Sequence, residues 1–403
     1  MPNVIPEVET FARIKVVGVG GSGKNSINHM INSKVKGVEF IAINTDAQDL
    51  HHSLAKRKIH IGKNLTKGLG TGMNPDLGRR AVEETKEEVQ EALKGADMVF
   101  VAGGLGGGTC SGASPVVART AKELGALTVS VVTKPFFFEG TQRMKVADLA
   151  LEGLKKEVDA IIVIPNDRLL SNIDKTTTAK AAFAMCDEIL KQAVEGISDL
   201  ITTPGIINID FADIRAIMES AGPALMGVGI ASGEKRAEDA AKMAINSPLL
   251  DVSIAGARGV LFSIAGGDDL TMFEIQDAAK VITESIDPNA RVIFGTVRDE
   301  KLKKGDVKIT VIASGFGEPT QRVEQKKSLF TTEVPEHREE RRMFSSPKPA
   351  QAPMPIVESE EVKTETHHIE KKHDEPKPHA IPTIDADTDD DWGAVPAFLR
   401  RKK

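Results

Sequence analysis

Residues 103–112 read GGLGGGTCSG, so that six of these ten residues are glycine. The run follows an apolar stretch, Ala96–Ala102, that is typical of a buried strand, and it precedes Pro115–Leu124, which has the pattern of a helix. Glycines without a Cβ let backbone N–H groups approach an anion closely, and a helix start adds unpaired N–H donors and the positive end of the helix dipole. The run therefore predicts a phosphate-binding turn. A flexible linker, the alternative, is not expected between a buried strand and a helix start.

Apolar strands and helices alternate along the first half of the chain. Because these strands are apolar throughout, the alternation predicts a parallel sheet covered by helices on both faces. A long helix is then expected over Lys175–Ile201, and a shorter one over Phe211–Ser220. The expected strands are Ile14–Val19, Glu39–Asn44, Ala96–Ala102, Ala126–Val132 and Ala160–Ile164, and the helices between them include Ile27–Ser33 and residues 76–94.

A second, smaller α+β block is expected from Gly222 onward. Its last two strands are separated only by a short turn at Lys303–Asp306, which predicts a hairpin. The expected strands are Met226–Ala231, Gly259–Ala265, Ala290–Val297 and Val307–Ala313, and the expected helices are Glu234–Asn246 and Thr271–Ser285.

The pattern of strands and helices ends near Gln321. The segment that follows is rich in Glu, Lys, Pro and His and has too few apolar residues to offset chain entropy, which predicts disorder. At the end of the chain Trp392, Phe398 and Leu399 stand beside clustered charges, as in a docking peptide on a flexible tether. The tail histidines are better interpreted as solvated than as a metal site, so no metal-ligating residue is predicted.

Composition narrows the class of protein. A formal net charge of -6 and 4% aromatic residues, with no Tyr, argue against a nucleic-acid binder. The two cysteines fit a reducing cytoplasm. We find no signal-peptide pattern and no apolar run near the roughly 20 residues that span a bilayer, so we expect no direct membrane insertion.

The loop GVGGSGKNS at residues 18–26 fits two nucleotide motifs incompletely. It matches G-x-G-x-x-G after a strand, with Asp46 placed to bind a ribose, which would suggest an NAD-dependent dehydrogenase. It also nearly matches a P-loop, but Asn25 stands where Ser or Thr would hold Mg²⁺. A second glycine run and a third glycine-bearing loop at 68–75 favour a triphosphate instead.

The order of five motifs resembles the FtsZ family, the bacterial tubulin-like division GTPases, over about residues 11–317. They are the first loop, Asn44–Asp46, the run at 103–112, Val132–Phe136 and Asn208–Asp213. The resemblance implies a tubulin-like GTPase domain with a Rossmann-like parallel sheet, a long central helix, a smaller α+β C-terminal domain and a disordered tail. It also implies GTP-dependent head-to-tail homopolymers that form a cytoplasmic ring at midcell. The end of the chain resembles the family's C-terminal peptide, which implies that Pro396–Arg401 docks on membrane-tethering proteins similar to FtsA or ZipA.

On this basis the chain divides into six segments. They are an N-terminal extension (1–12), a GTP-binding domain (13–174), the central helix with an aspartate loop (175–221), a C-terminal domain (222–318), a linker (319–388) and a docking peptide (389–403).

The resemblance also assigns the nucleotide site, which would hold GTP or GDP. Asn166 and Asp187 would contact guanine, and Glu139 and Arg143 would lie near the ribose and phosphates. The residues expected around the phosphates are Gly21, Ser22, Gly23, Lys24 and Asn25 in the first loop, and Gly108, Thr109 and Cys110 in the second. Without the family, Glu139 and Arg143 would be a solvated ion pair on one helix, and Asp187 an ordinary polar position.

Asp210 and Asp213 are the expected catalytic residues. From the sequence alone, Asp210 is an N-cap and Asp213 supports the first turn of a helix. The resemblance implies that both enter the next subunit's pocket and orient water against the γ-phosphate, with help from Asn208 and with Mg²⁺ offsetting charge.

Four residues depart from the family pattern. Ser22, Lys24 and Cys110 stand where glycine is usual, and Ser111 where threonine is usual. We expect slow turnover. The alternative, a structural polymer with little hydrolysis, is opposed by the retained aspartates. The position of Cys110 at a helix start could lower its thiol pKa, although a small packed side chain is the favoured interpretation.

Overall fold

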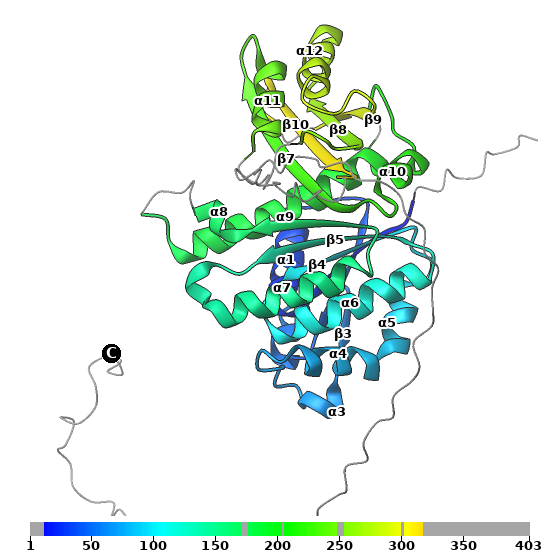
Figure 1. Cartoon of the computed structure of the whole chain (residues 1–403), viewed down its shortest axis with the longest axis vertical. Coiled ribbons are helices and arrows are strands. Elements are labelled where there is room, and N and C mark those ends of the chain that lie inside the picture. The colour runs from blue at the N-terminus through cyan, green and yellow to red at the C-terminus, as the bar shows by residue number, and fades with distance from the viewer. Residues whose placement is uncertain (1–11, 171–175, 204, 248–253, 300–301, 317–403) are drawn as a thin grey trace, which may run out of the picture. The chain divides into compact units, whose positions relative to one another are not determined.

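The structure is a computed structural model that describes residues 12–170, 176–203, 205–247, 254–299 and 302–316 (Figure 1). The linker at 319–388 and the docking peptide at 389–403, with Pro396–Arg401, lie outside the described residues, as do residues 1–11 of the N-terminal extension (1–12).

Ten strands of the described residues form one sheet in the order β3-β2-β1-β4-β5-β6-β7-β10-β8-β9. The pairings from β3 to β7 are parallel, whereas β10 pairs antiparallel with both β7 and β8. The strands are β1 (Ile14–Val19), β2 (Val38–Asn44), β3 (Arg57–His60), β4 (Met98–Gly104), β5 (Leu127–Lys134), β6 (Ala160–Pro165), β7 (Gly222–Ser232), β8 (Gly259–Gly266), β9 (Arg291–Arg298) and β10 (Asp306–Ser314).

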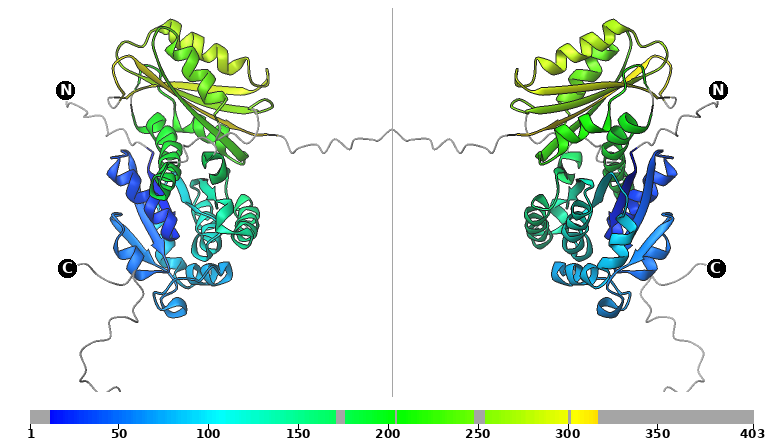
Figure 2. Two further views of the ribbon diagram at one scale, coloured as in Figure 1. Left: turned by 90° about the vertical axis from the view of Figure 1, so that its left-hand side faces the viewer. Right: turned by 90° about the vertical axis from the view of Figure 1, so that its right-hand side faces the viewer.

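Helices cover both faces of the parallel part, as the apolar strands predict (Figures 1 and 2). Val16 of β1 packs in a core with α1 (Gly20–Asn32), α9 (Ala179–Thr202) and α10 (Phe211–Met218). Its neighbour Val17 points to the other face, because side chains alternate along a strand. There it packs with α4 (Pro75–Glu84), α5 (Lys86–Leu93), α6 (Gly108–Glu123) and α7 (Thr141–Lys155).

Short helices link the strands at the edge where the parallel strands end. They are α2 (Ala47–His51), α3 (Lys63–Thr66), the 3₁₀ helix η1 (Phe137–Glu139) and α8 (Asn166–Leu170). Strand β3 has no counterpart in the sequence-based prediction, because its sequence Arg-Lys-Ile-His carries a single apolar residue.

The second domain has its own core, in which α11 (Arg236–Ile245) and α12 (Met272–Thr283) pack on the antiparallel strands. The expected hairpin between the last two strands is wrong. Strand β9 pairs in parallel with β8, while β10 inserts between β7 and β8. Burial explains the order. The largely buried β10 belongs inside the sheet, whereas β9, which is exposed or partly exposed at five of its eight residues, belongs at an edge.

Helix α6 begins seven residues before the expected start at Pro115. Small residues of low helix propensity therefore form two turns of helix. Packing overrides propensity here, since α6 lies against α4 so closely that a Cβ on Gly112 would collide with the carbonyl oxygen of Pro75. In the same way, α1 starts at Gly20, so that the first glycine loop is itself the start of a helix.

None of the helices in the described residues is long and apolar enough to cross a membrane.

Candidate functional site

A cavity of about 390 Å³ lies where the first turns of α1 and α6 meet the ends of β4 and β5. Its size is in the range of small-ligand pockets. Ten of the twelve residues expected to bind nucleotide line it: Gly21, Ser22, Asn25, Gly108, Thr109, Cys110, Glu139, Arg143, Asn166 and Asp187. Gly23 and Lys24 do not.

Two helix N-termini form one end of the cavity. Neither the residue before α1, Val19, nor the residue before α6, Gly107, caps its helix with a side chain. The first N–H groups of both helices are thus left for a ligand, and both dipoles favour a negative charge. A Cβ on Gly107 would meet nothing within 4 Å, so the chain leaves open space there. This end of the cavity suits phosphate.

Gly23 lies where α1 packs against β4 and does not line the cavity. A Cβ at this position would lie 2.7 Å from the carbonyl oxygen of Ala102, so glycine is needed for α1 to pack against β4. It supports the phosphate end from behind.

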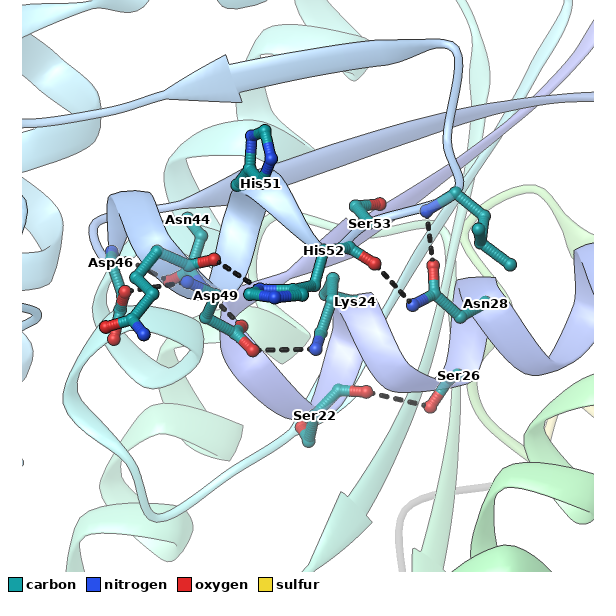
Figure 3. A network of polar contacts seen from close by, with 12 residues as sticks. Ser22, Lys24, Ser26, Asn28, Asn44, Asp46, Asp49, His51, His52 and Ser53 are labelled. Carbon is teal, nitrogen blue, oxygen red and sulfur yellow. Dashed lines mark hydrogen bonds and ion pairs between the residues drawn. The ribbon is translucent and has the colours of Figure 1, made fainter.

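Lys24 also points away from the cavity (Figure 3). Its Nζ lies 2.6 Å from Oδ1 of Asp49, and its side chain is only 9% exposed. Asp46, the residue that suggested ribose binding, does not line the cavity either; it caps α2 by accepting a hydrogen bond from the N–H of Asp49 at 2.9 Å.

Hydroxyl groups join the loops around the phosphate end. The Thr109 hydroxyl lies 2.7 Å from that of Thr45 and 3.2 Å from that of Thr71, which links α6 to the end of β2 and to the loop before α4. The Ser111 hydroxyl accepts a hydrogen bond from the N–H of Gly106 at 2.9 Å. These bonds hold the cavity wall in place.

Cys110 is a small, buried and packed side chain, as we expected from the sequence. Its thiol contacts the Ser114 hydroxyl at 3.3 Å, and burial raises its pKa to about 11. The alternative of a lowered pKa is wrong, because the loss of solvation of a thiolate outweighs the helix N-terminus.

Glu139 and Arg143 form an ion pair across two elements, since Glu139 ends η1 and Arg143 lies in α7. The Glu139 carboxylate also accepts a hydrogen bond from the N–H of Phe136 at 3.0 Å. Nε of Arg143 is buried and has no hydrogen-bond partner among the described residues. The guanidinium therefore keeps a donor for a ligand.

Asn166 and Asp187 line the cavity from α8 and α9. The Asp187 carboxylate accepts a hydrogen bond from the Ser26 hydroxyl at 2.6 Å, and burial raises its pKa. Oδ1 of Asn166 is buried without a partner in the part of the chain that the structure describes. Buried amides are normally satisfied, so this oxygen points to a donor on a ligand.

Sequence reasoning missed Phe183, which lines the cavity from α9. Its ring packs edge to face on Phe136 with centroids 5.4 Å apart and stays 46% exposed, so it presents an apolar surface on which a base can lie. The available signal was its spacing, one helical turn before Asp187.

Asn208, Asp210 and Asp213 are exposed and do not line the cavity. Asp210 is the N-cap of α10, as expected, and accepts a hydrogen bond from the N–H of Ala212 at 3.2 Å. Asp213 lies in the first turn, and Oδ1 of Asn208 accepts from the N–H of Gly205 at 2.7 Å.

Comparison with known proteins agrees with this architecture. Residues 13–174 match the GTPase domain of the Tubulin/FtsZ family, and residues 222–317 match the C-terminal domain of the FtsZ family. A mutant of FtsZ from M. jannaschii is 46% identical over 76% of this chain and 92% of its own, with a TM-score of 0.73. An empty FtsZ dimer from M. jannaschii is 44% identical over 81% of this chain and 96% of its own, with a TM-score of 0.74. CetZ2 from Haloferax volcanii, solved as a protofilament bound to GTPγS, shares the fold at 23% identity over 77% of this chain and 95% of its own, with a TM-score of 0.63.

The parallel sheet, the paired helix N-termini and the second domain thus define a tubulin-like protein with a GTPase domain. Within that class, the chain belongs to the FtsZ family.

Proposed function

We propose that this chain binds GTP in the cavity and hydrolyses it only in a head-to-tail homopolymer, where the neighbouring subunit supplies Asp210 and Asp213. The observation that carries the proposal is that two groups needed for hydrolysis lie apart in one chain. The N-termini of α1 and α6 line the cavity, whereas Asp210 and Asp213 at the acidic start of α10 are exposed and do not line it.

The lining residues fit a guanine nucleotide. The N-termini of α1 and α6 bind the phosphates through backbone N–H groups. The Asp187 carboxylate accepts from the ring N–H and exocyclic amine of guanine, a donor pair that adenine lacks. The unpartnered Oδ1 of Asn166 offers a further acceptor at the same end.

Mg²⁺ would be held mainly by the phosphates. The described residues contain no group of three or more His, Cys, Asp or Glu side chains that could hold a metal ion. Mg²⁺ commonly binds through substrate phosphates, one or two carboxylates and water, so this arrangement is compatible with a Mg²⁺–nucleotide complex. The ion would neutralise phosphate charge.

The carboxylates of Asp210 and Asp213 would orient a water molecule and accept its proton, and the Asn208 amide would help to place it. Hydrolysis would then depend on assembly.

We further propose that the polymer forms the division ring at midcell in the cytoplasm and recruits division proteins. Pro396–Arg401 would dock on membrane-tethering proteins similar to FtsA or ZipA.

A mixing experiment tests the shared site. Asp213→Ala should assemble but hardly hydrolyse GTP, and Asp187→Ala should bind GTP poorly. In a random 1:1 copolymer, roughly a quarter of the interfaces join the intact cavity of an Asp213→Ala subunit to the intact acidic start of α10 of an Asp187→Ala subunit. Hydrolysis should therefore return to about that fraction of the parent rate. The rate per subunit of the parent should also show a threshold concentration. Absence of recovery in copolymers shown to contain both variants would contradict the proposal.

A second candidate is a nucleotide-bound structural polymer with little hydrolysis. It is favoured by the bulk of Ser22 and Cys110 at the phosphate end of the cavity. The exposed carboxylates of Asp210 and Asp213 argue instead for turnover of GTP. We expect turnover that is slow but measurable, and Cys110→Gly should change it if the thiol restricts the phosphates. Family membership leaves the NAD-dependent dehydrogenase without support.

A further inference from the structure

Lys24 is a buried cation that the binding site described above does not use. Its side chain leaves α1 on the side away from the cavity and ends on Asp49 of α2 (Figure 3). A charge removed from water needs a partner, and the 2.6 Å contact between Nζ and Oδ1 of Asp49 supplies one.

The Asp49 carboxylate is fixed on both oxygens. Oδ1 meets the Lys24 ammonium, and Oδ2 accepts a hydrogen bond from Nδ2 of Asn44 at 2.8 Å. Asn44 is the last residue of β2, so the carboxylate is tied to α1 and to the sheet at the same time.

This carboxylate lies directly behind the phosphate end of the cavity. A Cβ on Gly21 would stand 3.4 Å from Oδ2 of Asp49, and Gly21 lines the cavity. The negative charge of Asp49 is therefore separated from the expected phosphate position only by the backbone of Gly21.

Alone, that charge would oppose a polyphosphate. The Asp49 side chain is only 31% exposed, so solvent and salt screen it less than a surface group. The Lys24 ammonium is itself nearly buried and neutralises the negative charge of the Asp49 carboxylate by direct contact.

We propose that Lys24 is a positioning residue for nucleotide binding that acts through Asp49. It neutralises the carboxylate behind Gly21 and holds it against Asn44, so that the affinity of the site for phosphate depends on an internal ion pair. The inference rests on the proposed binding of GTP.

The test is a double-mutant cycle in the full chain with Lys24→Met, Asp49→Asn and the double variant. Dissociation constants for guanosine, GDP and GTP are measured by calorimetry at fixed Mg²⁺ and salt, with melting curves as a check of folding. Lys58→Met is the matched control, because its Nζ donates to the carbonyl oxygen of His51 in the same helix, α2, without a carboxylate partner in that contact.

Lys24→Met should weaken GTP binding by about tenfold, GDP binding less and guanosine binding hardly at all, because repulsion grows with phosphate charge. In the Asp49→Asn background the same substitution should have little of this effect. Asp49→Asn alone should raise the ratio of GTP to guanosine affinity, which keeps the test valid if Lys24→Met fails to fold.

Three outcomes would overturn the inference. An equal loss for GTP in both backgrounds would mean that Lys24 contacts phosphate directly. An equal loss for guanosine and GTP would mean a purely structural role, and a lower GTP-to-guanosine ratio in Asp49→Asn would exclude repulsion by Asp49. Failure of the parent to bind any of the three ligands would instead refute the proposed function.

Discussion

The hydroxyl of Ser22 accepts a hydrogen bond from the backbone N–H of Gly104 at 2.5 Å. Ser22 lies in the first turn of α1 and Gly104 at the end of β4, so this bond joins the two glycine-rich segments that form the phosphate end of the cavity. The serine at this position thus adds a contact within the cavity wall.

Ser22→Ala should lower the free energy of unfolding by about 1 kcal/mol, because the Gly104 N–H loses its partner. GTP affinity should fall as well, since the two segments are no longer joined. Urea unfolding and a GTP titration measure the two effects. The control is Ser285→Ala, which removes a hydrogen bond to the carbonyl oxygen of Val281 in α12 and should leave GTP affinity unchanged.

Both cysteines should be inert in the folded protein. Burial raises the pKa of Cys110 to about 11 and that of Cys186 to about 12, so almost no thiolate exists at pH 8. Alkylation by iodoacetamide should be slow at pH 8 and become rapid only in denaturant. Rapid labelling of Cys110 in the native protein would contradict the packing described.

The same pKa shifts predict a loss of stability in alkali. The folded-state pKa values exceed that of a free thiol, so the stabilising contribution is complete below about pH 9 and is lost as pH rises toward 11 to 12. Urea unfolding between pH 8 and pH 10.5 should show this decline. Cys110→Ser should show a smaller one, because a serine hydroxyl does not titrate in this range.

Asp210 should have two separable roles. Asp210→Ala should cost about 1 kcal/mol of stability, because α10 loses its N-cap. Asp210→Ser keeps a capping oxygen and should restore stability, yet hydrolysis should stay about a hundredfold below the parent in both variants if the carboxylate acts on water.

The control for Asp210 is Thr271→Ala, which removes the N-cap of α12. It should lower stability by a similar amount and leave hydrolysis intact. Recovery of hydrolysis in Asp210→Ser would mean that only the cap matters.

The Asn166 side chain should contribute to GTP binding but not to the stability of the protein without nucleotide. Because its buried Oδ1 has no partner in the described part of the chain, Asn166→Leu should leave the melting temperature without nucleotide unchanged or raise it. Saturating GTP should then stabilise this variant much less than it stabilises the parent. A melting-temperature series against GTP concentration measures both effects, and a variant stabilised like the parent would exclude Asn166 from the site.

Much of the architecture follows from local patterns. The apolar runs locate β1, β2 and β4 to within a few residues, because a strand buried on both faces must be apolar along its length. The N-cap at Asp210 also follows from sequence, since a capping bond spans only two residues.

Other features depend on what packs against each residue. The direction of Lys24 is set by Asp49, which lies on another helix. The raised pKa of Cys110 comes from burial between α6 and the sheet, which no local pattern encodes.

The amino-acid sequence by itself thus determined the two-sided parallel sheet and the glycine-rich loops that surround the cavity, because hydrophobic periodicity and glycine spacing act over a few residues. The family followed from the resemblance of its ordered motifs. Only the tertiary structure decided that β10 lies inside the sheet, that Pro115 lies within α6, that Phe183 reaches the cavity and that Lys24 turns away from it. Those outcomes depend on burial and on partners distant along the chain, and competition among such contacts is resolved only when the chain is folded.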